Sequence, residues 1–245
     1  MKRAAWAVLA LSASPLLAGS SVVGSRAALA TSSPYATRAG LDVLKRGGNA
    51  ADAAVAAAFA LAVANPQSGL GGGGFLTYYD AASGAVWTLD FRETAPAAIK
   101  PGILGPKASG PITAGVPGTV AGLAAMHERF GARPWSELLA PAIHLARDGV
   151  PVSADLASDI ARAKSERSLD PYPGLSAGST LTQKDLAATL ERIAANGARD
   201  FYVGDGARQM VDALANTNRC GALRSASRTA STTSTRPRRH LPPES

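Results

Sequence analysis

Cysteine is almost absent from this sequence, in which Cys220 is the only one among 245 residues. A lone cysteine excludes a disulfide within the chain and a metal site built from several thiolates, and we expect neither a bound metal nor another cofactor. The apolar run at residues 4–18 is shorter than a membrane-spanning helix requires. Apart from a targeting signal, the sequence therefore predicts no integral membrane segment.

Excess positive charge is missing from most of the chain. Residues 219–245 hold six arginines and one glutamate, whereas residues 1–218 hold 19 basic and 17 acidic residues. The net charge of +7 thus comes mainly from the C-terminal segment. The nearly neutral remainder has no basic helix and no basic residues interleaved with aromatic ones. This distribution argues against a nucleic-acid partner.

The N-terminus has the form of a secretory signal peptide. Lys2 and Arg3 precede the apolar residues 4–18, and small residues follow. We place the signal at residues 1–20, although small residues permit an end anywhere between 18 and 30. The earlier end is favoured because residues 26–30 could form the first strand of the mature protein. A periplasmic or secreted protein is expected; the alternative is an apolar N-terminus without defined structure.

A run of glycines between Gly69 and Gly74 is followed by two apolar segments, residues 75–79 and 85–89, joined by a loop that ends at Gly84. This pattern predicts a β-hairpin. The run also matches G-x-G-x-x-G, but a dinucleotide site needs a strand before the glycines and a helix after them. Here the predicted order is reversed, so the glycines indicate close backbone packing.

The remaining pattern predicts a mixed α/β (α+β) fold. Asn49 should cap one helix, with the Asp52 carboxylate in the first turn where it suits the helix dipole. Thr119 should cap a second helix, and Thr182 should begin a third. Helices are predicted from Pro34 to the glycine pair 47–48 and at residues 50–64, 120–130, 135–147, 154–166, 182–196 and 205–215, with a short strand at 112–118. Residues 217–245 show neither helical nor strand periodicity in their apolar residues. We therefore expect a disordered tail or the product of a truncated or frameshifted reading frame.

Arg92 follows the second predicted strand, within the segment Asp90 to Pro96. A guanidinium at the end of a rigid strand can donate two parallel hydrogen bonds to a carboxylate. The alternative is an ion pair of the arginine with Asp90 or Glu93. Glu93 is expected to be a structural partner rather than a catalytic group.

Taken together, the motifs resemble the gamma-glutamyltransferase family (gamma-glutamyltranspeptidase, glutathione hydrolase). The resemblance covers residues 26–216, the expected partial large-subunit domain. Its order and spacing are more specific than any single motif. The matching pieces are residues 30–34 with 36–37, 47–56, 66–74, 90–96, 115–118, 134–135 with 138 and 141–143, and the helix from 181 that ends near 201–204.

The resemblance implies an N-terminal-nucleophile hydrolase with an αββα sandwich, incomplete here and followed by a helical region. Such a precursor cuts itself, and the new N-terminal threonine of the small subunit attacks the γ-amide of glutathione or another γ-glutamyl compound. Its free α-amine can take the hydroxyl proton. The acyl group then passes to water or an amino acid. At the matching position, Arg92 would bind the α-carboxylate of the γ-glutamyl group.

The sequence departs from the family in having no Thr-Thr-His motif, since Thr232-Thr233 is followed by Ser234. No catalytic residue is therefore assigned, and we expect the chain alone to be inactive. His127 and His144 lie in predicted helices and are expected to be solvated or packed there. Two alternatives stay open: a cephalosporin or glutaryl acylase of the same superfamily, against which Arg92 argues weakly, and a non-catalytic secreted binding or structural fragment.

Overall fold

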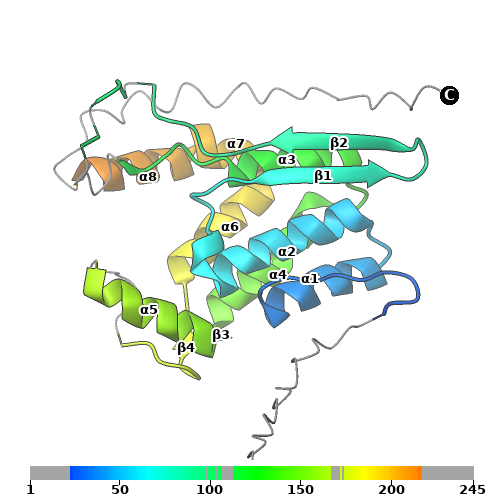
Figure 1. Cartoon of the computed structure of the whole chain (residues 1–245), viewed down its shortest axis with the longest axis horizontal. Coiled ribbons are helices and arrows are strands. Elements are labelled where there is room, and N and C mark those ends of the chain that lie inside the picture. The colour runs from blue at the N-terminus through cyan, green and yellow to red at the C-terminus, as the bar shows by residue number, and fades with distance from the viewer. Residues whose placement is uncertain are drawn as a thin grey trace, which may run out of the picture.

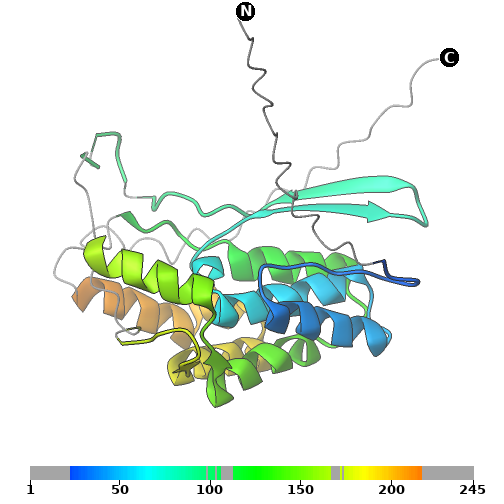
Figure 2. The same cartoon turned by 60° about the horizontal axis from the view of Figure 1, so that its bottom comes forward.

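The structure is a computed structural model that describes residues 23–216 except 98, 103, 106–112, 167–171 and 173. Helices predominate, and a long β-hairpin lies over one side of the helical body (Figure 1, Figure 2). The elements are α1 (Pro34–Lys45), α2 (Ala50–Ala64), η1 (Pro66–Ser68), β1 (Phe75–Asp80), β2 (Ala85–Asp90), α3 (Thr119–Phe130), α4 (Trp135–Asp148), β3 (Val150–Pro151), α5 (Ala154–Glu166), β4 (Thr180–Leu181), α6 (Lys184–Asn196), α7 (Ala198–Val203) and α8 (Asp205–Asn216).

Helix α2 begins with the Asn49 cap that its sequence predicts, and Asp52 completes a capping box with it. The Asn49 side chain accepts from the Asp52 amide, and the Asp52 carboxylate accepts from the Asn49 amide, both at 3.0 Å. The other oxygen of Asp52 accepts from the amides of Ala132 and Arg133, at 2.9 and 3.2 Å. Asp52 is fully buried. One carboxylate thus caps α2 and fastens the loop after α3 to it.

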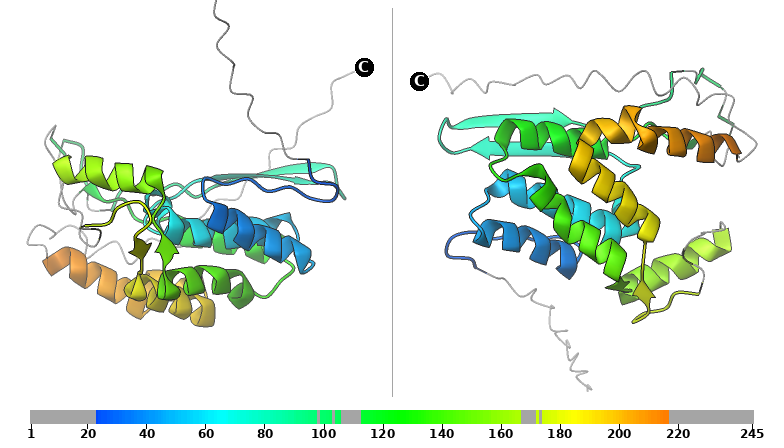
Figure 3. Two further views of the ribbon diagram at one scale, coloured as in Figure 1. Left: turned by 90° about the horizontal axis from the view of Figure 1, so that it is seen from below. Right: turned by 180° about the vertical axis from the view of Figure 1, so that it is seen from behind.

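The core is centred on α2, which packs against α1, α3 and α4. Its apolar residues point in nearly every direction, and ten of its fifteen residues are buried, as a helix apolar all round requires. Phe59 is fully buried and meets the edge of Trp135, with ring centroids 5.4 Å apart. Helices α4, α6, α7 and α8 continue the body in sequence order, each in contact with the next of this series (Figure 3).

The hairpin is antiparallel, with Phe75 opposite Asp90 and Asp80 opposite Ala85. The inner face carries Tyr78, which stacks on Phe130 of α3 with ring centroids 4.2 Å apart. Exposure alternates along both strands, as a half-covered hairpin requires. In the turn, Ser83 and a backbone amide hydrogen-bond the Asp80 carboxylate, which lowers the pKa of Asp80. The predicted hairpin is confirmed.

Some predicted element ends were wrong. Thr119 is the first residue of α3 rather than its cap, because its amide donates to the Gly72 carbonyl and Gly118 takes the cap position. Helix α6 begins after Gln183 rather than at Thr182; the Gln183 side chain instead donates to the Val63 carbonyl.

Two predicted strands also differ. Residues 26–30 are coil, because no described strand lies beside them to supply hydrogen bonds. Within the described part of 112–118, pairing is limited to one bridge between Thr94 and Val116.

The described residues form two separate two-stranded sheets, β1–β2 and β3–β4, rather than a complete sandwich. The predicted signal at 1–20, the tail at 217–245 and Cys220 lie outside the described residues. Within the part that the structure describes, none of the helices has the length and apolar character needed to span a bilayer.

Candidate functional site

Arg92 lies immediately beyond the end of β2, where the chain leaves the hairpin for the helical body. Its amide donates to the Asp90 carboxylate at 3.0 Å, which fixes the backbone at this point. Its Nη2 lies 3.2 Å from Oε1 of Glu93, and just over half of the arginine side chain (54%) is exposed. The guanidinium therefore has donors left for a ligand that arrives from solvent.

Two glycines of the run hold the backbone around Arg92 at very short range. A Cβ on Gly73 would lie 2.4 Å from the Phe91 carbonyl oxygen and 2.7 Å from Cα of Arg92. Gly74 exchanges backbone hydrogen bonds with Phe91, at 3.0 and 3.4 Å, and so prolongs the hairpin ladder. By contrast, a Cβ on Gly71 would meet nothing within 4 Å. Close backbone packing is thus confirmed for Gly73 and Gly74 and is not a property of the whole run.

A third segment, residues 115–118, closes around the same point. Thr94 and Val116 form a two-hydrogen-bond bridge at 2.8 and 3.2 Å, and the amides of Gly118 and Thr119 both donate to the Gly72 carbonyl. A Cβ on Gly118 would lie 1.9 Å from the Phe91 carbonyl oxygen. The glycine run, the end of β2 and the start of α3 therefore meet at Arg92. The sequence showed these motifs separately but gave no sign that they touch.

Glu93 forms an ion pair with the preceding residue, Arg92. Its Oε1 faces Arg92, while its Oε2 is buried and has no hydrogen-bond partner among the described residues. Gly115 makes room for it, since a Cβ there would lie 3.0 Å from Cβ of Glu93. The ion pair foreseen as an alternative for Arg92 thus exists with Glu93, but it joins adjacent residues at a half-exposed site. Exposed ion pairs of this kind contribute little to stability.

The two predicted helix histidines have local partners. Nε2–H of His127 donates to the carbonyl of Arg133 at 2.7 Å, and its ring packs 5.2 Å from that of Trp135. His144 lies on the exposed side of α4, with Nδ1 3.7 Å from a carboxylate oxygen of Asp148. Packing explains the first histidine and solvation the second, as the sequence indicated.

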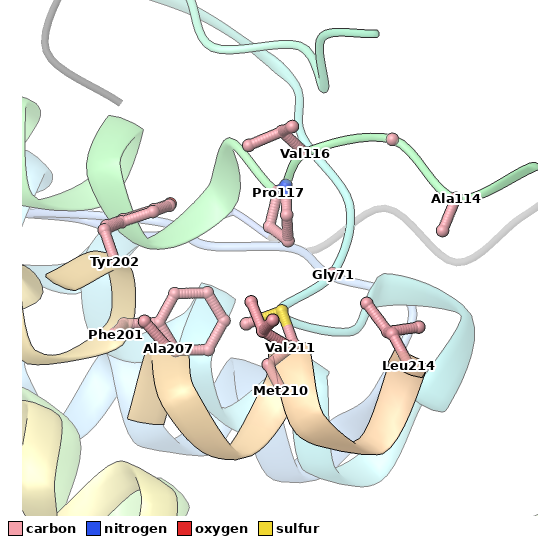
Figure 4. A pocket seen from close by; sticks show the side chains of 11 residues that line it. Gly71, Ala114, Val116, Pro117, Phe201, Tyr202, Ala207, Met210, Val211 and Leu214 are labelled. Carbon is pink, nitrogen blue, oxygen red and sulfur yellow. The ribbon is translucent and has the colours of Figure 1, made fainter. Parts of the chain in front are cut away.

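An apolar cavity of about 210 Å³ lies between residues 114–117 and helices α7 and α8 (Figure 4). Gly71 and Pro117 form one wall, and Phe201, Met210 and Leu214 form the other. None of the described residues that line it is charged, so it does not suit a carboxylate ligand. Across the described ranges, no group of three or more His, Cys, Asp or Glu residues could hold a metal ion.

Comparisons with known proteins agree on one family. The family model described as "Gamma-glutamyltranspeptidase" matches residues 36–226. The chain is 44% identical over 199 residues to the glutathione hydrolase proenzyme of Pseudomonas aeruginosa. The matched region covers 75% of this chain and 35% of that protein. The chain spans about a third of the length of the curated relatives it matches.

Solved structures show the same relationship. The gamma-glutamyltranspeptidase of Pseudomonas nitroreducens, complexed with L-DON, superposes with a TM-score of 0.74 at 38% identity; the match covers 80% of this chain and 62% of that one. A cephalosporin acylase from Bacillus halodurans superposes with a TM-score of 0.70 at 29% identity, over 85% of this chain and 44% of that one. The mixed helix and strand fold is thus that of N-terminal-nucleophile hydrolases of this kind.

Proposed function

The chain belongs to the gamma-glutamyltranspeptidase family, and from this premise we propose that it supplies substrate recognition to an enzyme that cleaves the γ-glutamyl amide of glutathione. The γ-glutamyl group would pass to water or to an amino acid. Arg92 would bind the α-carboxylate of that group. The observation that carries the proposal is an exposed guanidinium on a backbone fixed by three converging segments.

The chemistry of Arg92 suits a carboxylate. A guanidinium presents parallel N–H donors that match the two carboxylate oxygens, and it stays charged at any working pH. Glu93 pairs with one nitrogen atom of the guanidinium, Nη2. The fixed backbone keeps the guanidinium near one place before the ligand arrives, which lowers the conformational entropy lost on binding.

The bond-breaking step would depend on residues that this chain does not provide. We assign the nucleophile to an N-terminal threonine of a self-cleaved small subunit, whose α-amine takes the hydroxyl proton during attack on the γ-carbonyl. The amide C–N bond would then break, the amine leaving with the proton returned by the α-ammonium group. The γ-glutamyl ester that remains would react with water or an acceptor amine. On this account the 245-residue chain alone neither hydrolyses γ-glutamyl-p-nitroanilide nor cleaves itself. Turnover or self-cleavage by the purified chain would contradict the assignment of the nucleophile to a separate small subunit.

The exposed face of the hairpin is consistent with a larger αββα sandwich. Phe75, Tyr79 and Val86 lie on the outer face of β1 and β2 and are 71%, 63% and 40% exposed. A strand pair with apolar residues on both faces is typical of a sheet covered on both sides. We propose that strands from the remainder of the family polypeptide cover this face. Export to the periplasm or the exterior, directed by residues 1–20, completes the proposal.

The related cephalosporin acylase supports a second candidate function, an acylase of the same superfamily. A glutaryl group keeps the terminal carboxylate of a γ-glutamyl group and lacks its amine. The two activities are therefore separated by comparing γ-glutamyl-p-nitroanilide with glutaryl-p-nitroanilide. A third candidate, a non-catalytic fragment, requires that neither compound is turned over in any assembled form.

The proposed function is tested in a chimera in which residues 23–216 replace the matching segment of the Pseudomonas aeruginosa proenzyme. We expect the chimera to hydrolyse γ-glutamyl-p-nitroanilide in preference to the glutaryl compound. Arg92→Ala should raise KM at least about tenfold, because a charge-assisted contact contributes roughly 1.5–3 kcal/mol. Gly71→Ala is the matched control, since a Cβ there meets nothing within 4 Å. An unchanged KM in Arg92→Ala would remove the assigned role.

A further inference from the structure

Helix α3 starts beside Arg92 without a side-chain cap of its own. Its N-cap residue is Gly118, and neither this residue nor Thr119 supplies a capping hydrogen bond from its side chain. The first N–H groups of any helix need acceptors from elsewhere. The Gly72 carbonyl serves the amide of Thr119 at 3.0 Å. The backbone N–H of Ala121, in the same first turn, needs another acceptor.

That acceptor is the phenol oxygen of Tyr202, on helix α7. The amide of Ala121 donates to it at 3.0 Å across a separation of 81 residues. Figure 4 shows Tyr202 extending from α7 to the ribbon of α3. Burial raises the pKa of Tyr202 to about 12. The phenol therefore stays neutral at working pH and accepts hydrogen bonds through its oxygen.

The turn that Tyr202 caps is the turn that holds Phe91. A Cβ on Gly122 would lie 2.1 Å from Cγ of Phe91, so the aromatic ring lies directly on this part of α3. Gly118 touches the Phe91 carbonyl in the same way. Glycine inside a helix costs roughly 1 kcal/mol relative to alanine, and here close contact with Phe91 explains its presence. Any shift of the first turn of α3 must therefore move the residue next to Arg92.

We propose that Tyr202 is a positioning residue for the carboxylate-binding arginine. By capping α3 it fixes Gly118 and Gly122 against Phe91, and Phe91 in turn fixes Arg92. Tyr202 touches no substrate in this role. The part of the proposal that concerns the substrate rests on the proposed function of Arg92, whereas the mechanical link from Tyr202 to Arg92 does not.

The mechanical link is tested by hydrogen–deuterium exchange of the 245-residue chain with Tyr202→Phe. Exchange should rise in the first turn of α3 and also at residues 91–94, where the amides of Phe91 and Thr94 are hydrogen-bonded. Tyr79→Phe is the control, because it removes the same hydroxyl from an exposed tyrosine. Unchanged exchange in α2 shows that the variant is folded. A rise confined to α3 would overturn the proposal.

The effect on the arginine is tested in the chimera. Tyr202→Phe should raise KM for γ-glutamyl-p-nitroanilide about three- to tenfold, the range expected for one lost hydrogen bond, and leave kcat within about twofold. In an Arg92→Ala background the same change should leave KM unaltered. An equal rise in both backgrounds would overturn the positioning role. If Arg92→Ala itself leaves KM unchanged, the proposed function fails, while the exchange experiment still decides the link.

Discussion

Helix α2 is buried on nearly every side, whereas the β1–β2 hairpin is packed on one face only. In the helix even the capping carboxylate of Asp52 is buried and fully hydrogen-bonded. On the hairpin, Phe75 and Tyr79 are mostly exposed. Arg92 lies where the hairpin meets the start of α3, with Gly73, Gly74 and Gly118 packed against the backbone beside it. The difference is consistent with the proposal that strands of the family polypeptide cover the outer face of the hairpin, while the helical body buries its own apolar residues.

The largest effect is expected from Phe59→Ala in the core of the helical body. Phe59 is fully buried against Trp135, so the change removes apolar contacts and leaves a cavity. It should lower the free energy of unfolding by about 3–5 kcal/mol. Urea unfolding followed by circular dichroism measures this. A loss below about 1 kcal/mol would mean that the helical body is not tightly packed.

The next largest effect is expected from Asp52→Ala. Three backbone amides, those of Asn49, Ala132 and Arg133, lose their acceptor inside the protein. Orphaned buried donors of this kind should cost about 2–4 kcal/mol in total. Asp42→Ala is the control, because that carboxylate makes only an exposed ion pair with Lys45. Equal losses for the two variants, measured by urea unfolding, would contradict the buried network.

Alkaline pH should weaken the junction through Tyr202. Its folded-state pKa is raised from 10.0 to about 12, so the unfolded chain loses the phenol proton first as the pH rises. The contribution is intact below pH 10 and falls between pH 10 and 12, by about 2–3 kcal/mol overall. Tyr202→Phe should lack this extra loss, while the other tyrosines contribute equally to both proteins. Parallel stability–pH curves for the two would count against burial of the phenol.

The smallest effect is expected from Val86→Thr on the outer face of the hairpin. In the 245-residue chain this side chain is exposed, so the change should alter the free energy of unfolding by less than about 0.5 kcal/mol. In the chimera the same change should cost more, because the proposed strands would cover the valine. An equal, small effect in both proteins would mean that the outer face stays open in the assembled enzyme.

Local patterns in the sequence predicted the parts of the fold that depend on neighbouring residues. Asn49, just before an apolar run, predicted the cap of α2. Two apolar segments joined by a loop that ends at Gly84 predicted the hairpin. Arg92 could be singled out because it follows a strand within a recognisable motif. Short elements such as α7 carry too little periodicity to be found in this way.

Contacts between distant segments could not be predicted from one sequence. Thr119 looked like a helix cap, yet the cap of α3 comes from Tyr202, which lies 81 residues from Ala121. Gly122 lies within the helix predicted at residues 120–130, and no neighbouring residue in the sequence indicates that the ring of Phe91 lies on it. Such contacts depend on how helices pack, and they leave no local pattern around either partner.

The central claim, that Arg92 binds the α-carboxylate of the γ-glutamyl group, is tested most directly by removing both partners in turn. The chimera and its Arg92→Ala variant are assayed with γ-glutamyl-p-nitroanilide and with 4-aminobutyryl-p-nitroanilide, which lacks the carboxylate. Arg92→Ala should lower kcat/KM at least about tenfold for the first compound and leave it unchanged for the second. Equal losses with both compounds would contradict the claim.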